Sequence, residues 1–558
     1  MSERSEGQRR LDNAAAWICG LRAADIPREV TSLAVAQRMN IVASIFAGSQ
    51  TSIGRAVGCM LDRLGDSGPV KALPDGAQRS VLGAVYQHAA LGSAIELDDF
   101  VFGGHTGQAA VGVPLALGQM LGSSGEEILL AQIAANEVAG RLGVVMTTGP
   151  QHGHMKAYLH RAAAATAAAR LLRLGEDQTA KALAIALAMP EYPLFPAAFS
   201  ADTKALCTAD PTVAGVRAAL LAADGLDAAT DIVEHAVGLV TSLSVIENVP
   251  PIWDRLGHSY CLHAICYKPV AACAYASAAA LAIDEIVSRE GGRWEPERAR
   301  KVEVGTTVLT LTMEGFSKPH RADAVTTANV NFSTRRTAAL AMLVGAPHGK
   351  HFAAGRLDAM APDIRKLSQR VVLHHHWPHT LGMLRGVDAA IDHPGRPGIY
   401  GMADAHKTME RFKAAFDTPS AVSLGDIPTL WSLPDGGGRY LFRRYAVGLR
   451  ARLPFRGGRE ARALYVSRET DLTRLSFRFS AKVALHMDDG RCLTHEVKLP
   501  RGFAGDPDRI SVPPEKLMRE VTDASDAAHA LALLSVLEDE GATAVAIGES
   551  AAMRANHA

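Results

Sequence analysis

Apolar residues recur at helical spacing, separated by short polar breaks, through the first half of the chain. The stretch SSGEEILLAQIAANEVAGRLG begins with Ser124 three residues before Glu127, the spacing of a capping box, and Gly143 is expected to end this helix. Two alanine-rich segments that follow are also predicted helices. Alanine-rich faces let helix axes approach closely, so the pattern predicts a tight helical bundle.

The pattern changes in the second half of the chain. Residues 301–313, KVEVGTTVLTLTM, are rich in β-branched side chains and partly alternate, which predicts a strand. Residues 474–500 read as two strands joined at Asp489-Gly490, a hairpin dipeptide. Residues 526–541 predict an amphipathic helix near the C-terminus.

Composition narrows the class of protein. A length of 558 residues predicts two or more domains, and equal totals of 58 basic and 58 acidic residues give no drive towards nucleic acid or anionic membranes. The N-terminus lacks the apolar core of a signal peptide, and no run reaches about 20 strongly apolar residues, so we expect no membrane partner. Seven cysteines without a CxxC pair fit reduced thiols in the cytoplasm.

The stretch ELDDFVFGGHTGQ places three acidic residues and a histidine on a glycine-rich loop between two predicted helices. Its glycines permit backbone conformations that other residues resist, and could hold His105 at the edge of a pocket beside Asp99. A carboxylate next to an imidazole can set its tautomer and move its pKa towards neutrality. The alternative is a solvated loop between helices.

The segment GPQHGHMKAYLH contains His152, His154 and His160. A metal site needs a third and a fourth ligand that the sequence does not show. Proton transfer or carboxylate binding by one of these histidines is therefore favoured over metal binding. A polar helix start with surface histidines explains the pattern equally well.

Two lysines, a histidine-rich run and a pair of arginines are further candidates for a functional site. Lys204 and Lys268 lie among small apolar residues, where a lysine either extends to water or binds an anion. The run HHHWPH, residues 374–379, looks like a metal site, but three adjacent residues cannot point the same way on a strand or helix, so we expect a structural or surface role. Of Arg335 and Arg336, one could face an anionic ligand.

At these residues the chain resembles the MmgE/PrpD family, which contains 2-methylcitrate dehydratase, cis-aconitate decarboxylase and iminodisuccinate epimerase. ELDD, HTG and Pro114 stand where the family has D-x-D-D, H-P-G and a downstream proline. TKALC is similar to TKPLH, KPVAAC to KPYPCC, and NFSTRRTAALAMLVG to FSLPYAVA followed by ALL. The resemblance runs in order over residues 30–350 and again over 478–520.

The resemblance implies catalytic roles for a set of five residues, Asp99, His105, His154, Lys204 and Lys268. Three further positions depart from the family and are expected to contact the substrate: Glu96 replaces an aspartate, Cys207 a histidine and Arg336 a tyrosine. A guanidinium in place of a phenol puts a fixed cation with bidentate geometry into the site.

The resemblance also implies the fold, which is mainly α with α+β. A large all-α helical domain is expected to comprise residues 1–266 and a C-terminal helix within 516–558. Residues 267–515 are expected to form a smaller α+β lid domain. The active site would lie between the two, in a homodimer that uses no metal and no organic cofactor.

The expected function is that of a cofactor-independent lyase acting on a small di- or tricarboxylate. Lysines and Arg336 would hold carboxylates, while a histidine tuned by Asp99 moves a proton at the carbon next to one of them. A dehydratase is favoured over a decarboxylase. An epimerase, a carboxylate-binding relative without turnover, and a metalloenzyme built on residues 374–379 remain as alternatives.

Overall fold

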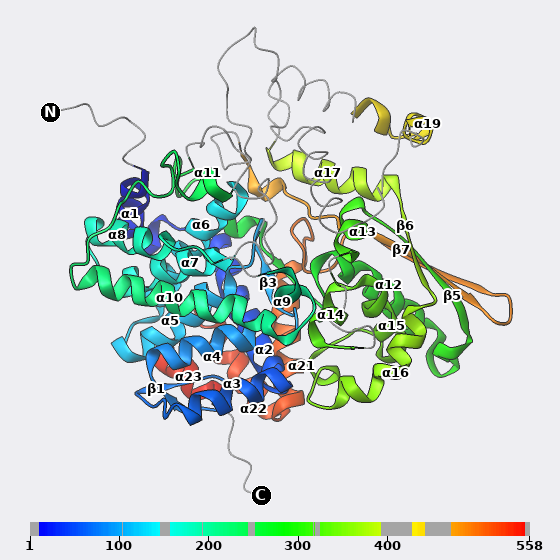
Figure 1. The fold of residues 1–558 in the computed structure, drawn as a ribbon, viewed down its shortest axis with the longest axis horizontal. Coiled ribbons are helices and arrows are strands. Elements are labelled where there is room, and N and C mark those ends of the chain that lie inside the picture. Colours follow the sequence, from blue (N-terminus) through cyan, green and yellow to red (C-terminus); the bar gives the residue numbers. More distant parts are fainter. Residues whose placement is uncertain are drawn as a thin grey trace, which may run out of the picture.

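The structure of the chain, a computed structural model, is described for residues 10–102, 104–145, 157–191, 194–243, 252–315, 317, 324–391, 427–440 and 470–552. Figure 1 shows a part built of helices beside a second part in which helices pack around a small sheet. The fold class is therefore mainly α with α+β content, as the sequence predicts.

The helical part contains the first eleven α-helices and two short strand pairs. Its helices are α1 (Arg10–Gly20), α2 (Arg28–Ser49), α3 (Ser52–Arg63), α4 (Val81–Ser93), α5 (Gly107–Leu121), α6 (Gly125–Val145), α7 (Ala157–Leu171), α8 (Glu176–Leu187), α9 (Phe195–Phe199), α10 (Leu206–Ala223) and α11 (Leu239–Leu243). Its strands are β1 (Val70–Lys71), which pairs with β2 (Gln78–Arg79), and β3 (Asp99–Phe100), which pairs with β4 (Cys266–Tyr267).

Small residues let these helices pack closely, as the alanine-rich sequence predicts. Helix α7 packs against α6 and α10, and its alanines are fully buried. At Gly215 of α10 an added Cβ would lie 2.3 Å from the backbone oxygen of Arg161 on α7. Such a distance is shorter than any van der Waals contact, so only glycine permits this helix crossing.

The second part surrounds a four-stranded mixed sheet. Its strands are β5 (Ala299–Thr306), β6 (Val371–His375), β7 (Ala481–Met487) and β8 (Cys492–Val497), in the order β6-β5-β7-β8. Strands β5 and β6 are parallel, and the other neighbours are antiparallel. Its helices are α12 (Ala274–Glu290), α13 (Val308–Glu314), α14 (Thr327–Phe332), α15 (Thr334–Val344), α16 (Arg356–Ser368), α17 (Trp377–Ile391) and α19 (Ile427–Ser432).

Several local predictions are confirmed. Ser124 and Glu127 form the predicted capping box, because each backbone N–H donates to the other residue's side chain at 2.9 and 3.3 Å. Strands β7 and β8 form the predicted hairpin, with Gly490 at φ 87° in its turn. All seven cysteines are free thiols.

Two local predictions are wrong. Helix α6 does not stop at Gly143 but continues to Val145, because burial of the whole helix outweighs the modest helix-breaking tendency of one glycine. The strand predicted for residues 301–313 ends at Thr306. The side chain of Thr307 accepts a hydrogen bond from the backbone N–H of Thr310 at 3.2 Å and so starts helix α13 within the β-branched run.

The end of the described chain returns to the helical part. Helix α21 (Val512–Ala524) packs along α2, α22 (Ala527–Glu538) packs on α21, and α23 (Ala544–Ala551) packs against α5. Figure 1 shows these orange and red helices among the blue ones. The domain boundaries at residues 266 and 515 stay predictions.

Within the described residues, three helical stretches are long and apolar enough to cross a membrane by length and composition alone, which the sequence analysis did not anticipate. They are Arg28–Ser49, Gly125–Val145 and Asp202–Ala223. In this fold their apolar windows are 89%, 100% and 67% buried against other parts of the protein. The expectation of no membrane partner stays a prediction.

Candidate active site

A two-residue strand pair brings the first two candidate segments together. In the pairing of β3 with β4, Asp99 lies opposite Tyr267 and Phe100 opposite Cys266. The register continues one step further, where the backbone N–H of Lys268 donates to the backbone oxygen of Asp98 at 3.2 Å. Asp98 and Lys268, which are 170 residues apart, therefore face each other as cross-strand neighbours.

Lys268 sits between two buried carboxylates. Its Nζ lies 2.5 Å from Glu96 Oε2 and 2.6 Å from Asp98 Oδ1, and all three side chains are at most 1% exposed. Burial alone would lower the pKa of Lys268, but the two carboxylates outweigh it and raise that pKa above its usual value. The lysine is therefore a permanent buried cation.

Lys204 closes the other side of the cluster. It lies in the 3₁₀ turn Asp202–Ala205 that leads into α10, and its Nζ is paired with Glu96 Oε1. The same Nζ donates to the backbone oxygen of Ser93 at 2.5 Å and lies 5.9 Å from the ring centre of Phe332 on α14. Lys204 thus connects the helical part to the second part of the fold.

The two carboxylates respond to these lysines. Burial raises the pKa of Glu96, yet Lys204 and Lys268 outweigh it and bring the pKa down to about 2. Burial likewise raises the pKa of Asp98, while His105 and Lys268 hold it well below its usual value. Glu96 also has φ 55°, a left-handed conformation that costs a non-glycine residue roughly 1–2 kcal/mol. Backbone strain at a buried charged residue is typical of functional sites.

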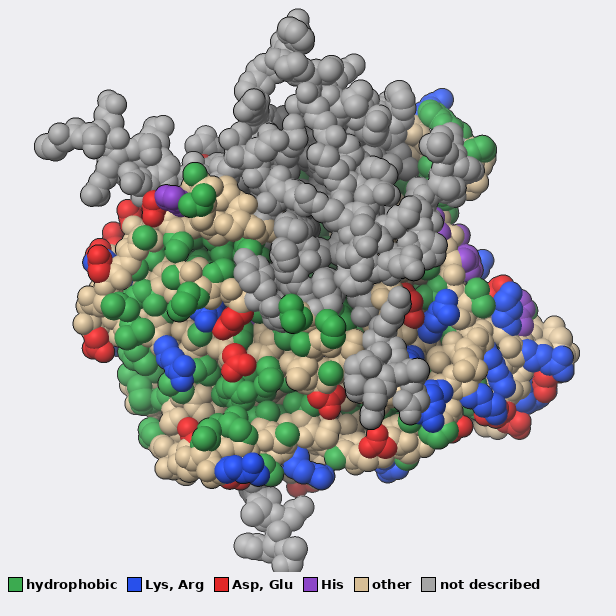
Figure 2. All heavy atoms as spheres, viewed as in Figure 1, with side chains coloured by type: hydrophobic (Ala, Val, Ile, Leu, Met, Phe, Trp, Pro, Cys, Tyr) green, Lys and Arg blue, Asp and Glu red, His purple; other side chains and the backbone are tan. Residues whose placement is uncertain are grey.

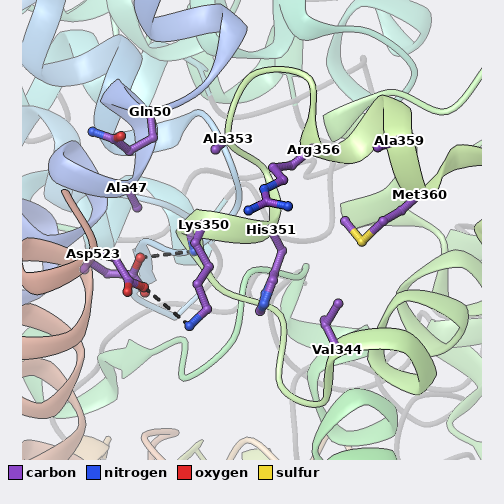
Figure 3. Close-up of a pocket in the computed structure, with 12 residues that line it drawn as sticks. Ala47, Gln50, Val344, Lys350, His351, Ala353, Arg356, Ala359, Met360 and Asp523 are labelled. Atoms are coloured by element: carbon purple, nitrogen blue, oxygen red, sulfur yellow. Dashed lines mark hydrogen bonds and ion pairs between the residues drawn. The ribbon is translucent and has the colours of Figure 1, made fainter.

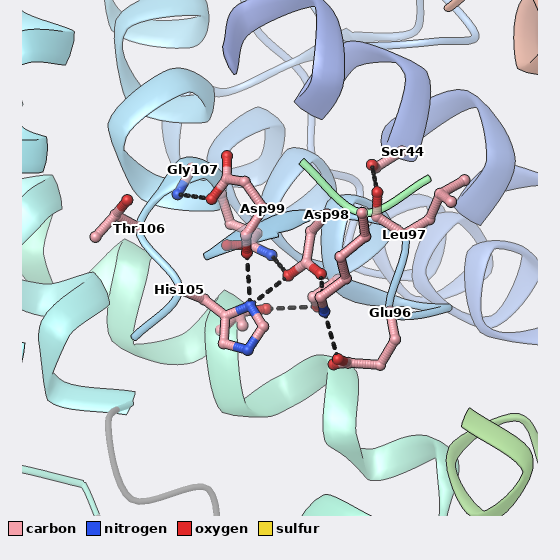
Figure 4. Close-up of polar contacts among 12 residues, drawn as sticks. Ser44, Glu96, Leu97, Asp98, Asp99, His105, Thr106 and Gly107 are labelled. Atoms are coloured by element: carbon pink, nitrogen blue, oxygen red, sulfur yellow. Dashed lines mark hydrogen bonds and ion pairs between the residues drawn. The ribbon is translucent and has the colours of Figure 1, made fainter. Parts of the chain in front are cut away.

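His105 lies beside this cluster and is oriented by it. Its Nδ1 is 2.7 Å from Asp98 Oδ2 and 2.9 Å from the backbone oxygen of Asp99. Both partners are acceptors, so Nδ1 carries the proton of the neutral ring and the basic lone pair is on Nε2. Figure 4 shows this second nitrogen on the side of the ring away from Asp98. The His105 side chain is 17% exposed, against 1% for Asp98.

The carboxylate partner of His105 is Asp98 rather than the predicted Asp99. Successive side chains of a strand point to opposite sides, so only one of two neighbouring aspartates can face the imidazole. Asp99 turns the other way, where its Oδ1 accepts from the backbone N–H of Gly107 at 3.2 Å. A Cβ at Gly107 would lie 2.2 Å from Asp99 Oδ2, so any larger residue at this helix start would displace the Asp99 carboxyl group.

Asp99 is a buried acid whose pKa is raised. It is fully buried, and its Oδ2 lacks a hydrogen-bond partner among the described residues. Burial and the neighbouring charge of Asp98 raise the pKa of Asp99 to about 7. Near neutral pH this carboxyl group therefore gains and loses a proton.

We expect Asp99 to make the protein less stable as the pH rises from about 4 to 7. In that window the folded carboxyl binds a proton that the unfolded one, with a pKa of about 3.9, does not. The slope from this one group is at most about 1.4 kcal/mol per pH unit. Asp99→Asn keeps the shape and removes the titration, so its stability relative to the original protein should increase with pH.

The measurement is urea unfolding of both proteins between pH 4 and pH 8. Asp98→Asn provides a control with no slope in this range, because the pKa of Asp98 is lowered and its stabilising contribution is constant above about pH 4 and is lost only below it. A stability difference between Asp99→Asn and the original protein that stays constant across this range would contradict a raised pKa.

Two residues of the site were missed by sequence reasoning. Lys516 on α21 is buried, and its Nζ donates to the backbone oxygens of Leu97 at 2.6 Å and Lys268 at 3.1 Å. Gln108 on α5 donates through Nε2 to Asp98 Oδ2. Burial lowers the pKa of Lys516 to about 7, with Arg519 as a second cause. The sequence feature that could have indicated Lys516 is its position on the apolar face of an amphipathic helix.

The remaining predicted residues are less closely tied to the cluster. Cys207 is buried one turn after Lys204, and burial raises the pKa of its thiol to about 11, so it is a neutral side chain. Arg336 is half-buried on α15, and its Nη1 donates to the backbone oxygen of Ala324 at 3.1 Å. Its role in binding the substrate stays a prediction. His154 lies outside the described residues.

The cluster also has the side chains of a metal site. Ligand atoms of Glu96, Asp98 and His105 lie within 4.8 Å of one another. However, the ammonium group of Lys268 already lies against the oxygens of both carboxylates, and a bound cation would have to compete with it. This donor set therefore fits an internal ion-pair network better than a metal. In the run of residues 374–379, His379 is 4% exposed and contacts Glu496 at 3.1 Å, a structural role.

A pocket of about 490 Å³ lies away from this cluster. It is formed by α2, the turn Gly349–His351, α16 and α21, so both parts of the fold contribute. Figure 3 shows Lys350 directed towards Asp523, which lies 3.9 Å from its Nζ. Its charged lining contains both lysine and arginine and both acids, so it favours no particular class of ligand.

The fold and the cluster together define a mainly α protein in which a carboxylate-oriented histidine stands next to buried lysine–carboxylate pairs. Residues 12–250, somewhat less than half of the chain, match the family model described as MmgE/PrpD N-terminal domain, and this match supports membership of the MmgE/PrpD family. The matched residues contain Glu96, His105 and Lys204, whereas Lys268 and Arg336 lie beyond them. No curated protein matches the chain.

Proposed function

We propose that the protein is a cofactor-independent lyase that acts on a small di- or tricarboxylate. The observation that carries this proposal is the His105–Asp98 pair at the edge of the buried cluster of Lys204, Lys268 and Glu96. Membership of the MmgE/PrpD family, which includes dehydratases, supports an enzyme of this general kind. The identity of the substrate and the type of reaction are part of this proposal.

The proton-transfer step is assigned to His105. Its Nδ1–H is held by Asp98 and by the Asp99 backbone oxygen, which leaves Nε2 as the basic atom. The carboxylate also stabilises the imidazolium formed when the ring takes a proton. A positioned acid or base of this kind contributes typically about 10²–10⁴-fold to a rate.

The charge-stabilising step is assigned mainly to Lys204. Removing a proton next to a carboxylate builds further negative charge on the substrate, which a fixed cation in a water-poor site stabilises. An ammonium has three N–H groups, and among the described residues Lys204 uses two, for Glu96 and the backbone of Ser93. One N–H remains for an oxygen of the substrate. Lys268, with no exposed surface, instead holds Glu96 and Asp98 in place.

Dehydration is the favoured reaction, and decarboxylation and epimerisation share its first chemical requirement. Each passes through a carbanion-like species next to a carboxylate. The test is incubation of 2-methylcitrate, citrate, cis-aconitate and iminodisuccinate with the protein in deuterated water, followed by NMR. Alkene formation without CO2 supports the dehydratase, CO2 release the decarboxylase, and deuterium at a retained stereocentre the epimerase. Binding without any conversion would contradict the lyase and support a carboxylate-binding relative.

The homodimer and the cytoplasmic location remain parts of the proposal. Figure 2 shows hydrophobic side chains gathered over the helical part, whereas lysines and arginines are more frequent over the sheet part. The exposed large apolar residues include Leu206, Leu220 and Leu221 of α10. Apolar surface of this kind is typical of contacts between subunits. Light scattering coupled to size-exclusion chromatography measures the oligomeric state.

A further inference from the structure

His160 is a buried histidine without a hydrogen-bond partner. It lies on α7, is 0% exposed, and neither Nδ1 nor Nε2 has a partner among the described residues. Buried polar atoms are nearly always paired, because leaving one unpaired costs the free energy of its lost hydration. The sequence therefore keeps an unfavourable group inside the bundle, although the positions one turn away on α7, Ala157, Ala163 and Ala164, are alanines.

The position of His160 relates it to the candidate site. Helix α7 packs against α5, which starts just after His105, and against α10, which starts just after Lys204. Burial, helped by the charges of His105 and Lys204 and opposed by that of Asp98, lowers the pKa of His160 to about 3. The ring thus lies within electrostatic reach of all three residues and is neutral at working pH.

A neutral imidazole recognises a different group from a lysine. It has one N–H donor and one lone-pair acceptor, which together complement a hydroxyl group. A carboxylate has only hydrogen-bond acceptors and binds more strongly to the ammonium group of Lys204. A neutral imidazole also adds no positive charge to the cluster, in which the charges of the two lysines are already balanced by Glu96 and Asp98.

We infer that His160 is a specificity-determining residue of this site, whose neutral ring hydrogen-bonds a hydroxyl group on the bound polycarboxylate. The inference rests on the proposed carboxylate site but adds the recognition of an uncharged substituent. It also explains why the group is unpaired in the protein alone, since its partner arrives with the ligand.

The test compares two ligands that differ in one hydroxyl group, citrate and propane-1,2,3-tricarboxylate, by isothermal titration calorimetry. The original protein is expected to bind citrate about tenfold more tightly, which corresponds to about one hydrogen bond. His160→Leu should remove this preference and leave the affinity for propane-1,2,3-tricarboxylate unchanged. His160→Asn or His160→Gln should restore it, because their amides place a donor near Nδ1 or Nε2 respectively.

Stability gives a second readout, with a matched control in the same bundle. His88 is also fully buried, but its Nε2 accepts from the backbone N–H of Leu73 at 2.9 Å and its Nδ1 lies 3.3 Å from the backbone oxygen of Gly112. His88→Leu should lower the melting temperature and leave the preference for citrate intact. His160→Leu should leave the melting temperature of the ligand-free protein unchanged or raise it, because no hydrogen bond is lost.

Three results would overturn the inference: equal affinities of the original protein for the two ligands, an equal loss of both affinities in His160→Leu, or a lowered melting temperature in His160→Leu. Failure of the proposed function looks different. In that case neither tricarboxylate binds the original protein, or Lys204→Met binds both as well as the original protein does.

Discussion

Replacing Lys268 by methionine is expected to destabilise the protein by about 3–5 kcal/mol, because removing one partner leaves buried charge uncompensated. Glu96 would keep Lys204, and Asp98 would keep His105, but each would lose a contact of 2.5 or 2.6 Å in a region without solvent. Methionine has a similar length, so little of the loss comes from a cavity. The effect should appear as a lower midpoint in urea unfolding at pH 7.

An exposed lysine provides the matched control. Lys366 makes an ion pair of the same length, 2.6 Å, with Glu297, but the two side chains are 55% and 53% exposed. Lys366→Met should cost less than about 1 kcal/mol, because water replaces the lost partner. A loss of that small size in Lys268→Met would contradict the buried ion-pair network.

The pH dependence of the Lys268→Met effect distinguishes a charge effect from a packing effect. The pKa values of Glu96 and Asp98 are lowered in the folded protein, so their stabilising contribution is present at neutral pH and is lost as the pH falls. The difference between Lys268→Met and the original protein should therefore shrink below about pH 4, where the carboxyl groups are protonated in both states of the variant. A packing defect would persist at low pH.

Local sequence signals predicted local structure wherever the whole signal lies within a few residues. The capping box joins Ser124 and Glu127, three residues apart, and the turn at Asp489-Gly490 joins strands whose nearest pair is His486 with Cys492; both are confirmed. The same kind of signal failed at Gly143, where packing of α6 against other helices decided the outcome. Short-range propensities are small against the free energy of burying a whole helix face.

Sequence motifs predicted the members of the candidate site better than the contacts between them. Sequence motifs brought out Lys204, Lys268 and His105, and the structure places all three around Glu96 and Asp98. The motif could not decide between Asp98 and Asp99 as the partner of His105, because that choice depends on the register of β3 against β4. Lys516 reaches the same cluster from 419 residues beyond Leu97, a distance at which no local pattern carries information.

The internal pairing of the lysines changes the interpretation of the motifs. From sequence, Lys204 and Lys268 were expected to bind the carboxylates of a substrate. In the structure the carboxylates nearest to them are the protein's own, so the cluster is balanced before any ligand arrives. Such a network fixes the geometry of its members at the expense of net attraction for an anion. The residue with accessible surface beside it, His105, is then the one from which the largest chemical effect is expected.

Replacing His105 by alanine should lower kcat by about 10²–10⁴-fold, the range typical of a general acid or base, with a small effect on KM. The reason is that a group which moves a proton in the transition state adds little to binding of the ground state. The measurement is steady-state kinetics on whichever acid the NMR experiment shows to be converted. His486→Ala is the matched control: His486 Nε2 makes a similar contact with Glu303 at 3.0 Å on the sheet, but the histidine is 41% exposed. It should leave kcat unchanged. If His105→Ala kept a kcat within a few-fold of the original, the proton would have to be moved by another residue, and the arrangement of Asp98 around His105 would be structural.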